Sequence, residues 1–110
     1  MKNQITFEDF AKLDIRIGQI TSVEVVEDAD KLLRFEFDFG SEKRQIIAGM
    51  RSFFSDLTTL KGKKLPVLCN IEPRTFRGQT SHGMIVAADD NGTPVFLQPE
   101  HDLPNGSIVK

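Results

Sequence analysis

Apolar and polar residues alternate most strictly between residues 33 and 39. Leu33-Arg34-Phe35-Glu36-Phe37-Asp38-Phe39 places four large apolar side chains on one face and three charged ones on the other, which is the period of a half-buried β-strand. Gly40-Ser41-Glu42 supplies turn residues, and residues 43–48 return as a second strand. The pattern predicts an antiparallel hairpin whose three phenylalanines belong to the core rather than to a base-stacking platform.

The preceding residues change period within a short stretch. Thr6-Phe7-Glu8-Asp9 has the form of a helix start, with a hydroxyl that can cap the first turn and acids near the positive end. Phe7, Phe10 and Ala11 give that segment one apolar side, so we expect a short N-terminal helix. From Leu13 the apolar residues alternate, which predicts a long first strand over residues 13–25, bent at Gly18.

The remainder of the chain has short apolar runs separated by turn residues. Residues 50–57 have a helical period and predict a short helix, while residues 65–71, 84–88 and 95–97 predict strands. Prolines and a glycine break up the tail. Together these elements favour an all-β fold in which a five-stranded barrel of the OB type has a short N-terminal helix, a short helix between strands 3 and 4, and a C-terminal extension.

Length and composition indicate one globular domain, residues 1–110, with 39% hydrophobic and 27% charged residues. No apolar run approaches the roughly 20 residues needed to cross a bilayer and no signal peptide is recognisable, so we expect a cytoplasmic protein. Cys69, the single cysteine, can form no intrachain disulfide and is expected to be a buried thiol.

The charge distribution is uneven although the formal net charge is only −2. Residues 1–30 carry three basic and seven acidic side chains, residues 31–77 carry ten and five, and residues 78–110 carry one and four. A basic middle segment suits a nucleic-acid ligand. A solvated basic face without a partner explains the charge equally well.

No combination of residues favours catalysis. Only His82 and His101 are available as histidine bases, and Gly78 to Gly83 has one residue too many before Ser81 for a nucleophile elbow. No phosphate loop, dinucleotide fingerprint or metal-ligand spacing is present. We therefore expect a protein that is not an enzyme and needs no metal or cofactor.

Residues 70–84 have the most informative content in the chain. Arg74 and Arg77 can each bind a phosphate bidentately, and Ser81 and Asn70 can hydrogen-bond a sugar or a base edge. These are the groups that an RNA ligand requires. A solvated loop whose glycines serve only turn geometry is the alternative.

Four ordered motifs make the chain resemble the tRNA-binding domain family, which includes the barrel appended to methionyl-tRNA synthetases, free-standing homodimeric relatives and the export chaperone CsaA. The motifs are Lys12-Leu13-Asp14-Ile15-Arg16-Ile17-Gly18, Ala29-Asp30-Lys31-Leu32-Leu33, Arg44-Gln45-Ile46-Ile47-Ala48-Gly49, and Pro73-Arg74 with Gly78, Ser81, Gly83 and Met84. The resemblance runs nearly end to end.

The resemblance implies that Lys31, Ser81 and Met84 contact RNA. Arg34, Arg44, Asn70, Arg74 and Arg77 are further candidates. Family members often have a lysine where this chain has Thr75 and a glutamate where it has His82. The first difference weakens RNA binding and the second favours it.

The function that the resemblance implies is structure-selective tRNA binding by a free-standing, non-catalytic homodimer. Its subunits are expected to pair through the helix in residues 5–11 and the tail from Val95 onward. Two alternatives stay open: an export chaperone like CsaA that binds unfolded peptides, and an accessory tRNA-binding subunit of an aminoacyl-tRNA synthetase. Nothing in the sequence indicates which tRNA is preferred.

Overall fold

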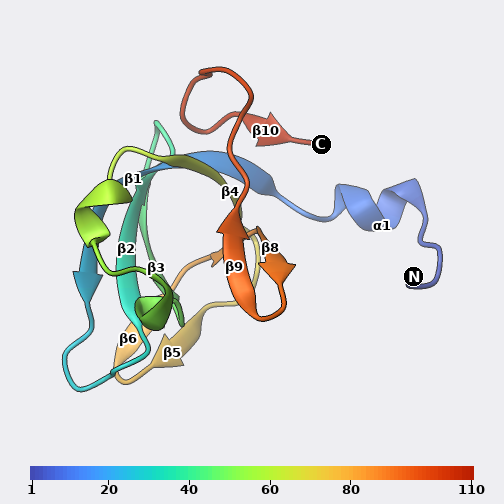
Figure 1. Cartoon of the computed structure of the whole chain (residues 1–110). Helices are drawn as coiled ribbons and strands as arrows, with labels where there is room; N and C mark the ends of the chain where they lie inside the picture. Colours follow the sequence, from blue (N-terminus) through green and yellow to red (C-terminus); the bar gives the residue numbers. More distant parts are fainter.

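A computed structural model describes residues 1–110 and shows a curled antiparallel sheet with two small hairpins beside it (Figure 1). Five strands lie in the order β3-β2-β1-β4-β7, which confirms the predicted all-β fold of the OB type. The bounds of this sheet are β1 (Ile15–Val25), β2 (Leu33–Asp38), β3 (Lys43–Ala48), β4 (Lys64–Leu68) and β7 (Met84–Ile85), with β10 (Ile108–Val109) added at the start of β1.

The long first strand belongs to both halves of the sheet. Its residues 15–19 pair with β4 and its residues 19–25 pair with β2, with a register shift between Ile20 and Ser22. Gly18 lies just before the change of partner, where a Cβ atom would come within 2.7 Å of the Phe39 ring and 2.9 Å of the Phe37 ring. A glycine at this position therefore lets the bent strand lie directly on the aromatic core.

The alternating face of β2 forms the centre of the core. Leu33, Phe35 and Phe37 are completely buried and Phe39 is 5% exposed, so the core assignment of these residues is confirmed. Burying one side chain of this size contributes about 1.5 to 3 kcal/mol. Cys69 is also buried, at 9% exposure, and burial raises the pKa of its thiol.

Residues 80–82, which come just before β7 at one end of the curled sheet, contact β3 at the other end. The amide of His82 donates to the carbonyl oxygen of Gln45 at 2.9 Å, and the Gln45 side chain donates to the Thr80 carbonyl oxygen at 2.9 Å. We call this contact between residues 45–47 of β3 and residues 80–82 the barrel seam. It closes the barrel without a continuous ladder of backbone hydrogen bonds.

Two hairpins stand beside the barrel, and the first was predicted only as a loop. It consists of β5 (Arg74–Phe76) and β6 (Gln79–Ser81), and the second of β8 (Ala87–Asp90) and β9 (Thr93–Phe96). Both turns have positive φ at two successive residues, 51° and 79° at Arg77-Gly78 and 50° and 91° at Asn91-Gly92. This is the geometry of a two-residue hairpin turn, for which Asn-Gly is the usual sequence and Arg-Gly is not.

The helical elements differ in part from the prediction. The predicted helix between strands 3 and 4 is instead two 3-10 turns, η1 (Arg51–Phe53) and η2 (Leu57–Thr59). Asp56 separates them because its carboxylate caps the Thr58 amide at 3.0 Å and so begins a new turn. No helix in the fold is both long and apolar enough to span a membrane.

The N-terminal helix α1 (Phe7–Ala11) is confirmed, including its cap, in which the Asp9 amide donates to the Thr6 hydroxyl at 3.0 Å. It projects away from the barrel (Figure 1) and buries none of its residues. Phe7 is 81% exposed. Among the apolar residues of α1 only Phe10 is half-buried, and Phe7 and Ala11 are exposed.

Candidate nucleic-acid interface

Two segments that are far apart in the sequence form one hollow on the surface. The loop between β1 and β2 and the turn of the β5–β6 hairpin border an open hollow of about 500 Å³, which is lined by Asp28–Leu32, Phe76 and Arg77. Lys31 comes from the first segment and Arg77 from the second, and both are exposed and form no ion pair within the chain. The fold thus places two unpaired cations around the same hollow.

Arg34 connects the adjacent strand to the same hairpin. Its guanidinium forms an ion pair with Glu24 and donates to the Gln79 side chain at 3.4 Å. The Arg34 side chain is 31% exposed. Because a carboxylate already shares its charge, Arg34 is less available to a phosphate than Lys31 or Arg77.

Arg74 lies on the aromatic ring that separates two hollows. Its guanidinium carbon is 4.8 Å from the centroid of Phe76, a cation–π distance. A second, much smaller hollow of about 60 Å³ is lined by Arg74 and Phe76 together with Met84 and Ser81, among others. Met84 is 48% exposed, so it is available for a contact and is not the buried gap-filler that its residue type alone favours.

Ser81 occupies the barrel seam and is 5% exposed. Its hydroxyl accepts a hydrogen bond from the Ile47 amide at 3.0 Å and donates one to the Gly83 carbonyl oxygen at 3.0 Å. Both functions of the hydroxyl are thus satisfied inside the protein. In this arrangement Ser81 positions the hairpin and Met84, and a direct contact with RNA would first require the seam to open.

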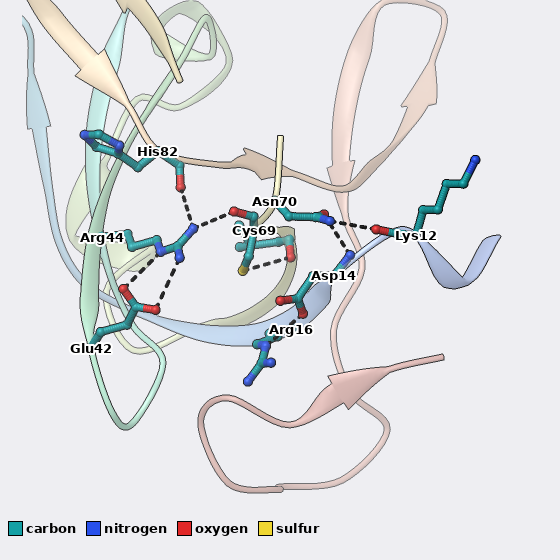
Figure 2. Close-up of polar contacts among 9 residues, drawn as sticks. Lys12, Asp14, Arg16, Glu42, Arg44, Cys69, Asn70 and His82 are labelled. Carbon is teal, nitrogen blue, oxygen red and sulfur yellow. Dashed lines mark hydrogen bonds and ion pairs between the residues drawn. The ribbon is translucent and has the colours of Figure 1, made fainter. Parts of the chain in front are cut away.

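Arg44 is also committed to contacts within the chain, as Figure 2 shows. It donates to the carbonyl oxygens of Cys69 at 2.5 Å and His82 at 3.2 Å, and its guanidinium pairs with both oxygens of Glu42 at 3.2 Å. The hydrogen bond to Glu42 raises the pKa of Arg44 above its usual value. These contacts tie β3 to the ends of β4 and β6, so Arg44 supports the barrel closure.

Asn70 fastens the N-terminal segment to the end of β4 (Figure 2). Its side-chain oxygen accepts from the Asp14 amide at 2.8 Å, and its side-chain nitrogen donates to the Lys12 carbonyl oxygen at 2.6 Å. Both the oxygen and the nitrogen of the Asn70 side-chain amide therefore have a hydrogen-bond partner. Its placement explains why an exposed polar residue follows a buried strand there.

The eight predicted site residues thus fall into two groups. Lys31, Arg34, Arg74, Arg77 and Met84 surround the hairpin, whereas Ser81, Arg44 and Asn70 hold the framework behind it. The sequence did not predict Phe76, Asp28 or Asp30 as binding residues, although Asp30 belongs to one of the quoted motifs, and all three also line the larger hollow. The available signal for this hairpin was Gly78, because a two-residue hairpin turn favours glycine at a position of positive φ.

The comparisons with known proteins agree on the family. Residues 15–108 match the family model described as "Putative tRNA binding domain". The chain belongs to the tRNA-binding domain family. As a tRNA-binding domain, it is 41% identical over 107 residues to methionine–tRNA ligase 1 of Bacillus cereus, an alignment that covers 97% of this chain and 16% of the ligase. The chain therefore spans about a sixth of that relative.

Two solved structures show the same domain over their whole length. The MetRS-related protein from Pyrococcus horikoshii superimposes with a TM-score of 0.91 at 26% identity and covers 99% of this chain and 100% of its own. The chaperone CsaA from Bacillus anthracis gives a TM-score of 0.88 at 31% identity, with 98% and 100% covered. The tRNA-binding domain described here is thus similar both to a protein described as MetRS-related and to a protein described as a chaperone.

Proposed function

We propose that this tRNA-binding domain is a free-standing, non-catalytic homodimer that binds tRNA by shape at the surface around the β5–β6 hairpin. The observation that carries the proposal is the shared hollow, where Lys31 and Arg77 lie together although 46 positions separate them. Unpaired cations on a common rim are what a phosphate backbone requires. tRNA as the ligand also implies the cytoplasm as the place of action.

The cations favour recognition of the shape of the RNA over recognition of its base sequence. Lys31, Arg74 and Arg77 reach outward from a small barrel, and no array of amide side chains accompanies them to read base edges in order. Folded RNA is recognised largely through its phosphates, its 2′-hydroxyls and its shape. Structure-selective binding of tRNA follows from such a surface.

The exposed apolar side of α1 supports the homodimer. Phe7 and Ile5 are 81% and 67% exposed and belong to neither core cluster. Beside β10 lies an apolar hollow of about 380 Å³, whose lining includes Ile17, Leu97 and Ile108. Covering these surfaces with a second copy would remove apolar area from water and would double the number of cations presented to one tRNA.

The same apolar hollow supports a second candidate function, that of a chaperone. An unfolded peptide could occupy it in place of a second copy, and the similarity to CsaA of Bacillus anthracis favours this reading. The similarity to part of a methionine–tRNA ligase supports a third role, an accessory tRNA-binding subunit of a synthetase.

A gel-shift titration with total tRNA, with an unfolded protein as competitor, tests the proposal. The variants are Lys31→Ala, Arg77→Ala and the pair together, and the matched control is Lys61→Ala, an exposed lysine on the turn between η2 and β4. We expect each site variant to weaken tRNA binding and the control to leave it unchanged. If about four phosphates are neutralised, the slope of log affinity against log salt is roughly −3 to −4, and each site variant lowers its magnitude by about 1.

Other results would identify the alternatives. Displacement of tRNA by the unfolded protein, with no effect of the site variants, would favour the chaperone role. Binding that appears only after a synthetase is added would favour the accessory role. A complex that is insensitive to salt would rule out phosphate contacts as the source of affinity.

A further inference from the structure

The hollow between the β1–β2 loop and the β5–β6 hairpin has an apolar floor in addition to its charged rim. Ala29 is 6% exposed, and Leu32 and Phe76 pack against the small core cluster that contains it. Phosphate recognition needs cations and N–H donors but no apolar surface. We propose that this hollow, the base pocket, holds one unstacked nucleobase of the bound RNA, an inference that rests on the proposed function.

Phe76 gives the base pocket an aromatic surface. The ring lines both the base pocket and the smaller hollow that contains Met84, whereas Arg74 lines only the smaller one. The guanidinium that lies 4.8 Å from the ring centroid therefore leaves the part of the ring in the base pocket uncovered. Bases of every kind stack on such rings.

The dimensions and charges of the base pocket suit one nucleotide. Its volume of about 500 Å³ lies within the roughly 300 to 1,000 Å³ of known ligand pockets. Lys31 and Arg77 are placed to hold the phosphates of the nucleotide whose base is inserted. An exposed rim is required here, because the RNA chain must enter and leave on either side.

Two carboxylates in the base pocket argue against a simple anion site. Asp28 and Asp30 line it, and neither forms an ion pair within the chain. A bare phosphate would be repelled by them, whereas an amino group could donate to them. Adenine, cytosine and guanine carry exocyclic amino groups and uracil does not, so the base pocket should discriminate against uracil.

Amide chemical shifts measured by NMR during titration with mononucleotides test this inference on the whole chain. The probes are AMP, CMP and UMP, and ribose 5-phosphate is the matched probe without a base. We expect AMP and CMP to shift the amides of residues 28–32 and 76–78, with affinity at least fivefold higher than that of ribose 5-phosphate. The affinity of UMP should lie between that of AMP and that of ribose 5-phosphate.

Three variants assign the effect to particular side chains. Phe76→Leu keeps an apolar side chain but removes the ring, and should reduce AMP affinity at least fivefold, whereas Phe53→Leu, at a 43% exposed ring elsewhere, should not. The double variant Asp28→Asn/Asp30→Asn should reduce the preference for AMP over UMP, because a neutral amide oxygen accepts more weakly from an amino group than a carboxylate does. Asparagine suits position 28 because it tolerates the positive φ of 61° found there.

The outcomes separate this inference from the proposed function. Equal affinity for AMP and ribose 5-phosphate, or no effect of Phe76→Leu, overturns the base pocket while leaving tRNA binding through phosphates intact. Base-dependent binding of mononucleotides by a chain that does not retain tRNA supports the base pocket and overturns the proposed function.

Discussion

The amide of Ile47 donates its hydrogen bond to the hydroxyl of Ser81, at 3.0 Å, across the barrel seam. Ser81→Ala would leave that buried amide and the Gly83 carbonyl oxygen without their partner. We expect a loss of about 1 to 3 kcal/mol in the free energy of unfolding, measured by urea denaturation, with the tRNA affinity of the folded protein reduced far less than by Arg77→Ala. Thr80→Ala, at a half-buried position of the same strand where the hydroxyl lies 3.3 Å from that of Thr75, is the control. Unchanged stability together with strongly weakened tRNA binding would show that Ser81 contacts RNA directly.

Arg77 is held in a backbone conformation that arginine rarely adopts, at φ 51°. Arg77→Asn would give this turn the same Asn-Gly sequence as the turn at Asn91-Gly92, which suits the geometry. We expect stability to rise by up to about 1 kcal/mol while tRNA binding weakens. Thermal unfolding and the gel-shift titration measure the two effects. A variant that is less stable than the parent would show that the Arg77 side chain makes contacts that outweigh its backbone cost.

Cys69 should make the free energy of unfolding fall at alkaline pH. Burial raises the pKa of its thiol, so the native state keeps a proton that the unfolded chain releases above about pH 8.5. The contribution is complete below that pH and is lost as the pH rises through the folded pKa. Urea midpoints at pH 7 and pH 9.5 should therefore differ more for the parent than for Cys69→Ala. An equal difference in both proteins would show that other groups cause the dependence.

Phe7 provides a test of dimerisation that does not disturb the barrel. Its side chain is 81% exposed and α1 buries no residue, so Phe7→Asp removes no contact within the barrel, and a lower unfolding midpoint would come only from the loss of dimerisation. We expect the variant to sediment as a monomer where the parent is a dimer, because a charge would be buried at the interface. Glu8→Ala on the same helix should remain dimeric. A parent that is itself monomeric would contradict the homodimer.

The sequence was sufficient for the elements that a strong local pattern marks. The strict alternation of residues 33–39 predicted both a strand and its buried face, and the capping residues around Thr6 predicted α1. Such patterns are local, because the side-chain period alone decides which face is apolar.

Short elements and polar partnerships could not be predicted in the same way. The β5–β6 hairpin has only three residues in each strand, too few to establish a period. The roles of Ser81, Arg44 and Asn70 depend on residues 34, 25 and 58 positions away, respectively. Serine, arginine and asparagine have the same donors and acceptors whether they face RNA or their own backbone.

The two sets of partners along β1 impose an order on folding. β2 and β3 follow soon after β1 in the chain, so residues 19–25 can pair within a local meander. Residues 15–19 have no strand beside them until residues 64–68 are available, and their other edge waits for residues 108 and 109. On a ribosome, the early half of β1 is therefore an unpaired sheet edge for much of synthesis, which exposes it to aggregation before the barrel closes.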